Sequence, residues 1–204
     1  MTTLIFDTET TGLAKEKRSP VDPSQPMPMQ LGMKLDADNR REVAAMNFLI
    51  QPMGWSIEPK ASEITGITDQ MATAYGTHLV TAVDLFLDMI KAADTVVAHN
   101  IAFDRIVMQR ACFVYSEMMG TPYSDPFEGK KMVCTMMASL NIVQALPKRR
   151  GEWKWPKLTE AVKYFFNEEL IGAHDALVDV RGCARVYYEL IDIGAFSGNY
   201  RYAE

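Results

Sequence analysis

The order of the apolar segments along the chain constrains its fold more than any other feature. Three strand-like segments come first, at residues 4–7, 29–35 and 42–50, with turn-forming residues at 36–40. Helix-like and strand-like segments then alternate: helices at 79–90, 101–115, 158–166 and 177–191, and strands at 94–98 and 131–135. A hairpin start followed by this alternation predicts an α/β fold, with a mixed sheet of about five strands, antiparallel and then parallel, flanked by helices.

Residues 14–28 separate the first two predicted strands. This segment is charged at first and then contains four prolines, at positions 20, 23, 26 and 28. Because proline lacks a backbone N–H and disrupts helices, the segment is predicted as a long excursion without a helix.

Length and composition limit the class of protein. The chain has 204 residues, so we expect one domain over residues 1–194 and a short tail over 195–204. A content of 48% hydrophobic and 23% charged residues is typical of a soluble globular protein, and the apolar runs are too short to span a membrane. A net charge of −5 excludes a general basic DNA-coating protein.

Two further features indicate a cytoplasmic protein. The N-terminus lacks the basic region of a signal peptide. Cys112, Cys134 and Cys183 stand singly in apolar surroundings and are expected as reduced core thiols.

Asp7 and Glu9 follow the first predicted strand. Side chains alternate along a strand, so residues i and i+2 place both carboxylates on one face. Adjacent carboxylates repel unless a cation lies between them, and their hard oxygens favour Mg²⁺ or Mn²⁺. A solvated turn is the alternative for this pair alone. Thr10, Thr11 and Gly12 favour a ligand site, because a glycine at a turn lets backbone N–H groups approach a ligand.

Asn100 and Asp104 form a second polar pair, at a predicted strand-to-helix junction. They are four residues apart and share one side of the first helical turn. Open α/β sheets bind ligands at such junctions. The local alternative is an N-cap at Asn100 and an exposed first-turn acid at Asp104.

A third group comprises His174, Asp175 and Asp179. Asp175 is a predicted N-cap, which places Asp179 in the first turns of the last helix, beside its apolar stripe. His174 then lies on the preceding loop. A lone histidine is more often structural than catalytic, but an imidazole can accept a proton near neutral pH.

These three groups, in this order, resemble the three motifs of the DEDDh branch of DnaQ-like 3′→5′ exonucleases. The matching segments are residues 6–13 (FDTETTGL), 99–104 (HNIAFD) and 173–179 (AHDALVD). That branch includes the proofreading subunit of bacterial replicative polymerase, RNase T and oligoribonuclease, within the RNase H-like superfamily.

The resemblance extends from the first strand to about Ile193 and takes in residues 61–68 (ASEITGIT). Thr65 stands where the family usually has histidine, and Cys134 where many members have aspartate. Neither departure touches the five functional positions.

The resemblance implies an RNase H-like fold and a two-metal 3′→5′ exonuclease that releases nucleoside 5′-monophosphates. By analogy, Asp7, Glu9, Asp104 and Asp179 hold two divalent ions, Mg²⁺ or Mn²⁺. His174 is the implied general base that deprotonates the attacking water.

The resemblance also indicates substrate contacts. It places the backbone of Thr10 and Thr11 near the terminal sugar and Leu13 beside the last base, with Asn100 as a further candidate. Phe103 is a candidate base-stacking residue, and core packing is an equally good interpretation of it.

Two basic patches are candidates for contacts with the phosphates of a strand. One consists of Lys15, Lys17 and Arg18; the other of residues 148–150 (KRR) followed by Trp153 and Trp155. The alternative is that the charges lie on solvated loops and the tryptophans pack.

The expected partner is nucleic acid with a free 3′ end, with single-stranded DNA favoured. An RNA-trimming exoribonuclease of the same family stays open, because the choice of sugar depends on pocket shape. A catalytically silent docking module is the third possibility, and the complete set of five functional residues counts against it. The sequence does not show whether a polymerase is a partner.

Overall fold

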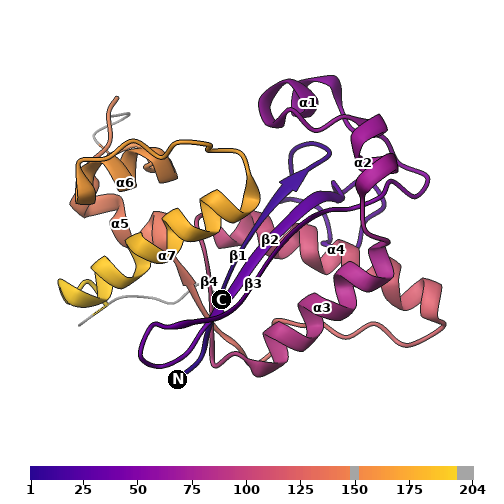
Figure 1. Ribbon diagram of the computed structural model, residues 1–204, viewed down its shortest axis with the longest axis horizontal. Helices are drawn as coiled ribbons and strands as arrows, with labels where there is room; N and C mark the ends of the chain where they lie inside the picture. Colours follow the sequence, from indigo (N-terminus) through magenta and orange to yellow (C-terminus); the bar gives the residue numbers. More distant parts are fainter. Residues whose placement is uncertain (148–151, 197–204) are drawn as a thin grey trace.

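The computed structural model describes residues 1–147 and 152–196 of the chain. At its centre is a five-stranded sheet in the order β3-β2-β1-β4-β5 (Figure 1). The strands are β1 (Thr3–Thr10), β2 (Pro28–Asp36), β3 (Glu42–Leu49), β4 (Thr95–Ala98) and β5 (Lys131–Cys134). β1 to β3 are antiparallel neighbours, whereas β4 and β5 run parallel to β1. The predicted mixed sheet is confirmed.

Helices surround this sheet. They are α1 (Pro59–Thr65), α2 (Asp69–Tyr75), α3 (Leu79–Ala92), α4 (Ile101–Met119), α5 (Thr135–Val143), α6 (Leu158–Phe166) and α7 (Ala176–Asp192). The apolar spacing predicted the four longer segments at α3, α4, α6 and α7. It missed α1, α2 and α5. α1 has seven residues and buries none of them, so it carries no apolar stripe, and α5 follows β5 without a break.

The alternation of side chains in β1 divides the core into two layers. Phe6 faces α3 and packs against Phe86 and Phe127, with ring centroids 5.5 and 5.9 Å away. Ile5 points to the opposite face and packs with residues of α6 and α7, such as Val180. α3 and α4 therefore cover one face of the sheet and α5 to α7 the other (Figure 1).

The excursion between β1 and β2 contains turns and no helix or strand, as predicted. The buried side chain of Gln25 closes it, because its amide group accepts a hydrogen bond from the Lys15 N–H and donates one to the Ser19 carbonyl. Thr11 and Met27 join its two ends through two hydrogen bonds of 3.0 Å.

The short parallel strands leave one end of β1 uncovered. β4 pairs with β1 only from Thr3 to Ile5, so the last residues of β1 extend beyond its neighbour. Loops and helix starts occupy this edge instead of a strand, and this is where ligands bind in open α/β sheets.

Cys112, Cys134 and Cys183 are buried free thiols, as expected. Within the two described ranges, no helix has both the length and the apolar character needed to cross a membrane. Of the predicted tail, residues 195–196 are described, and residues 197–204 lie outside the described part of the chain.

Candidate active site

Asp7 and Glu9 project from the uncovered end of β1 on the face that α7 covers. Both carboxylates are partly buried, and Thr8 between them points to the other face and is buried. The predicted side-by-side placement of the two acids is therefore present.

Asp104, in the first turn of α4, reaches the same edge from the other side of β1. Its Oδ1 accepts hydrogen bonds from the Thr8 backbone N–H at 3.0 Å and the Thr8 hydroxyl at 2.7 Å. Because β4 ends at Ala98, the Thr8 N–H has no neighbouring strand on that side, and Asp104 takes its place. The local alternative of an exposed first-turn acid is wrong: Asp104 is 3% exposed.

Asn100 precedes α4 in a left-handed conformation, with φ 73°. Asn100 is the N-cap residue of α4, as the local alternative had it, but its side chain makes no capping hydrogen bond. The left-handed turn directs the chain from β4 into α4 and thereby delivers Asp104 to the β1 edge.

The N-terminus of α7 is fastened to β2 and β3. Asp175 is the predicted N-cap and accepts hydrogen bonds from the N–H groups of Leu177 and Val178. Gln30 on β2 and Asn47 on β3 also donate to the Asp175 carboxylate, at 3.0 to 3.1 Å.

Gly32 on β2 lets the helix approach this closely. A Cβ atom at Gly32 would lie 2.4 Å from the Ala176 carbonyl carbon, so only glycine fits beneath the start of α7. Gln30 adds a hydrogen bond from the Ala176 N–H to its side-chain oxygen, at 3.1 Å. These contacts set the position of Asp179 one turn further on.

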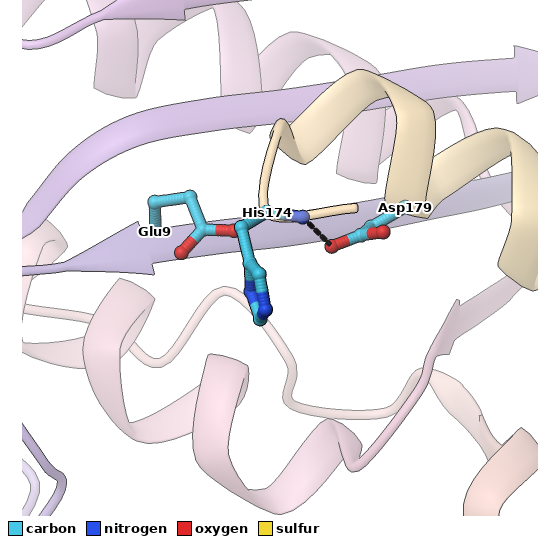
Figure 2. A group of neighbouring side chains, drawn as sticks. All are labelled: Glu9, His174 and Asp179. Carbon is cyan, nitrogen blue, oxygen red and sulfur yellow. Dashed lines mark hydrogen bonds between the residues drawn. The ribbon is translucent and has the colours of Figure 1, made fainter. Parts of the chain in front are cut away.

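Glu9, His174 and Asp179 converge at the mouth of the site (Figure 2). One ligand-type atom from each of the three lies within 4.8 Å of the other two. His174 is exposed on the loop before α7, in a left-handed conformation with φ 72°. Its backbone N–H donates to the Asp179 carboxylate at 3.1 Å, which ties the loop to the helix. His174 is therefore held beside two acids with its ring accessible to solvent.

Crowding of the acids raises their pKa values. Burial raises the pKa of Glu9 to about 8, with further contributions from the charges of Asp179, Asp104 and Asp175. Burial raises the pKa of Asp7 well above its ordinary value, and Asp104, Asp179 and Glu9 raise it further. Repulsion between the negative charges of these acids thus disfavours their ionised forms.

Asp104 and Asp179 respond to the same crowding. Burial raises the pKa of Asp104 to about 7, although the hydrogen bonds from Thr8 act to lower it. Burial likewise raises the pKa of Asp179, and the His174 N–H offsets this in part. Hydrogen bonds alone therefore do not compensate the negative charge at this edge.

A divalent cation would compensate the charges of the four acids, and Glu9, His174 and Asp179 have ligand atoms close enough together to hold one. Asp179 Oδ1 is buried and has no hydrogen-bond partner among the described residues. None of the ion pairs formed within residues 1–147 and 152–196 involves Asp7, Glu9, Asp104 or Asp179. Clustered carboxylates without a neighbouring Lys or Arg are stable when ionised only if a bound ion compensates them. Oxygen donors of this kind suit Mg²⁺ or Mn²⁺.

The predicted substrate-contact residues lie close in sequence to Glu9 and Asp104. Thr10 and Thr11 are buried, whereas Leu13 is 83% exposed just beyond them. Phe103 is partly buried and is not part of the three core clusters of the described residues, so core packing does not account for it.

Of the two predicted basic patches, the first lies wholly within the described residues and the second only in part. Lys15, Lys17 and Arg18 are exposed, and Arg18 pairs with Asp22 at 3.4 Å. Residues 148–150 of the second patch lie outside the described residues.

Several residues of the site carried no signal in the sequence. Thr8 donates to Asp104, 96 positions away. Gln30 and Asn47 donate to Asp175, which lies 145 and 128 positions away from them. His99 is another: its ring lies 2.9 Å from both the Thr135 hydroxyl and the Pro156 carbonyl. Such partners become visible only when the segments are brought together.

Comparisons with known proteins place this geometry in context. A family model described as "Exonuclease" (RNase_T) matches residues 4–187. E. coli Exonuclease I in complex with a dT13 oligonucleotide superimposes with a TM-score of 0.71 at 18% identity, covering 95% of this chain and 41% of that one. The zinc-bound E. coli ExoI–ssDNA complex gives a TM-score of 0.71 at 18% identity, covering 96% and 42%.

A further exonuclease I structure gives a TM-score of 0.72 at 20% identity, covering 94% of this chain and 41% of that one. The chain thus spans about two-fifths of the length of these structures and shares their fold. No curated protein sequence matched the chain.

Proposed function

The chain belongs to the RNase T exonuclease family, and from this premise we propose that it removes nucleotides one at a time from the 3′ end of single-stranded nucleic acid, with DNA favoured. The expected DnaQ-like membership and RNase H-like fold are confirmed. The observation that carries the proposal is the convergence of four acids and His174 at the uncovered end of β1. The oligonucleotide complexes of E. coli Exonuclease I support a single-stranded substrate.

In the proposed reaction, Asp7, Glu9, Asp104 and Asp179 hold two divalent ions, Mg²⁺ or Mn²⁺. When bound, such ions activate water and stabilise the charge that develops on the attacking and leaving oxygens. The hydrogen bonds from Thr8 leave the second oxygen of Asp104 for this purpose. Asp179 Oδ1, which is buried and has no hydrogen-bond partner among the described residues, is a second candidate ligand atom.

His174 is the proposed general base. Its exposed ring can accept a proton from a water molecule and release it to solvent. The hydrogen bond from its backbone to Asp179 holds the loop while the ring stays accessible. A neutral imidazole beside Glu9 and Asp179 would be oriented by the same acids that bind the cation.

The end of β1 also supports a pocket for one terminal nucleotide. Thr10, Thr11 and Asn100 offer polar groups for the sugar and phosphate, and Leu13 and Phe103 offer apolar surfaces for the base. Contacts of this kind would recognise the terminal nucleotide of a strand whatever its base.

The test is degradation of matched DNA and RNA oligonucleotides, each blocked at one end. With Mg²⁺ or Mn²⁺ we expect stepwise release of 5′-monophosphates from strands with a free 3′ end, and no release from strands blocked there. EDTA, or the substitution Asp7→Ala, is expected to reduce the rate by about 100-fold or more, because both remove charge stabilisation of the transition state. Full activity of Asp7→Ala would contradict the metal assignment. Faster cleavage of RNA would identify the exoribonuclease alternative, and binding without cleavage a silent module.

A further inference from the structure

Trp155 is an exposed tryptophan on the loop that leads into α6. Its side chain is 60% exposed, although large aromatic side chains are usually well buried. The alternative that the tryptophans pack is therefore wrong for Trp155. A surface hollow of about 410 Å³ lies beside it, lined by Pro147, Glu152, Trp153, Lys154 and Trp155. The loop thus presents an indole ring next to a concave, partly polar surface.

His99 places this loop at the edge of the sheet that carries the acids. His99 directly follows β4, and its Nδ1 lies 2.9 Å from the Thr135 hydroxyl, which in turn lies 3.5 Å from Cys183 Sγ. Burial raises the pKa of this Cys183 thiol and the charge of Asp7 raises it further, so the series of contacts leads from His99 towards the acids. The Pro156 carbonyl lies 2.9 Å from His99 Nε2. A carbonyl only accepts, so Nε2 carries the proton and donates. Trp155 is therefore joined, through its neighbour in sequence, to the residue that follows β4.

The loop is also fastened to α6. Lys154 Nζ pairs with Glu160 Oε1 at 2.6 Å, and the Lys157 backbone N–H donates to Glu160 Oε2 at 2.8 Å. The Lys154 N–H donates to the Ala145 carbonyl at 3.2 Å. An aromatic side chain on an anchored loop can bind a ligand without first being ordered.

We propose that Trp155 stacks on a base of the single-stranded substrate upstream of the terminal nucleotide, and this contact rests on the function proposed above. An aromatic face holds any unpaired base, so the contact needs no particular sequence. Lys157 is exposed two residues further on and supplies a positive charge for a phosphate of the same strand. We place the base that it holds beyond the two nucleotides at the 3′ end, so that binding depends on the length of the strand and a dinucleotide does not make the contact.

The experiment compares a dinucleotide with a twelve-nucleotide oligo(dT), using Trp155→Ala, Trp155→Phe and Tyr75→Ala. Tyr75 is 79% exposed on α2 and serves as the matched exposed-aromatic control. For the long strand, we expect Trp155→Ala to raise KM by roughly 5- to 100-fold with kcat unchanged. Trp155→Phe should retain much of the affinity, Tyr75→Ala all of it, and KM for the dinucleotide should not change.

Equal KM values for Trp155→Ala and the unmodified protein on the long strand would overturn the proposal. So would equal losses on the long and short substrates, because a damaged site and not a lost stacking contact would explain them. If the unmodified protein cleaved neither substrate, the proposed function itself would fail. That result differs from a failure of the Trp155 contact alone, in which cleavage continues.

Discussion

At the scale of single residues, Asp104 illustrates how the site is assembled. Two hydrogen bonds from Thr8 occupy one of its oxygens and leave the other for a ligand. Its burial raises its pKa to about 7, and an ionised carboxylate there needs a compensating charge. One threonine thus orients the carboxylate that we propose as a metal ligand.

His174 carries the clearest prediction at this scale. Loss of a general base typically costs 10²- to 10⁴-fold, so we expect His174→Ala to lower kcat by about 100-fold or more. The measurement is kcat on a single-stranded oligonucleotide with saturating Mg²⁺.

His78 provides the matched control for this substitution. It is exposed at the N-cap of α3 and has no assigned role in the reaction. His78→Ala should therefore keep the rate. An unchanged kcat for His174→Ala would remove His174 from the role of base.

At the scale of elements, the contact between α7 and β2 controls the site. His174, Asp175 and Asp179 all lie within the loop and first turn at this end of the helix, so any displacement of its start moves them together. The close approach at Gly32 and the side-chain amides of Gln30 and Asn47 thus set the positions of His174 and Asp179.

Gly32→Ala tests this dependence. Its new Cβ would lie 2.4 Å from the Ala176 backbone, which cannot move aside alone. We expect a loss of about 1–3 kcal/mol in the free energy of unfolding, measured in urea, and a lower kcat because Asp179 shifts. Gly182→Ala in α7 is the control: its Cβ would meet only the flexible ends of two side chains, Leu170 at 3.1 Å and Leu158 at 3.5 Å. Equal losses of unfolding free energy and of kcat in the two variants would show that the close contact at Gly32 does not position α7.

At the scale of the whole molecule, the acid cluster links stability to pH and metal. The pKa of Glu9 rises from 4.5 to about 8 in the folded protein, so the folded state retains a proton that the unfolded chain loses. This proton favours folding at low pH, and its contribution is lost as pH rises from about 4.5 to about 8. His99 acts in the opposite sense, because its pKa falls from 6.5 to about 4 and the folded state prefers the neutral ring.

Thermal unfolding in EDTA between pH 5 and pH 8 isolates the Glu9 contribution. We expect the Tm of the unmodified protein to fall with rising pH relative to that of Glu9→Gln, in which the site at position 9 no longer titrates. Addition of Mg²⁺ should raise Tm most at pH 8, where the ligands ionise at least cost. Parallel Tm profiles for the two proteins, with and without Mg²⁺, would refute the linkage.

We propose that residues 1–194 unfold as one domain. α7 packs on β1, β2 and β4 and also on α5 and α6. The last helix therefore contacts both the first strands and the helices before it. A single cooperative transition is the corresponding expectation.

The amino-acid sequence determined the strands and long helices, because each has an apolar period that the chain displays locally. It also identified the acids that meet at the β1 edge, partly from strand geometry and partly from the resemblance of the three motifs. The seven-residue α1 and α2 were missed because such short helices show no clear period.

Only the tertiary structure decided how those acids are held and where the substrate surface continues. The bond from Thr8 to Asp104 exists because β4 stops short, and the anchor from His99 to Pro156 joins residues 57 positions apart. Neither has a local pattern, since a hydrogen bond depends on the distance between two atoms and not on their separation along the chain. The exposure of Trp155 was decided in the same way, by what packs around the loop and what does not.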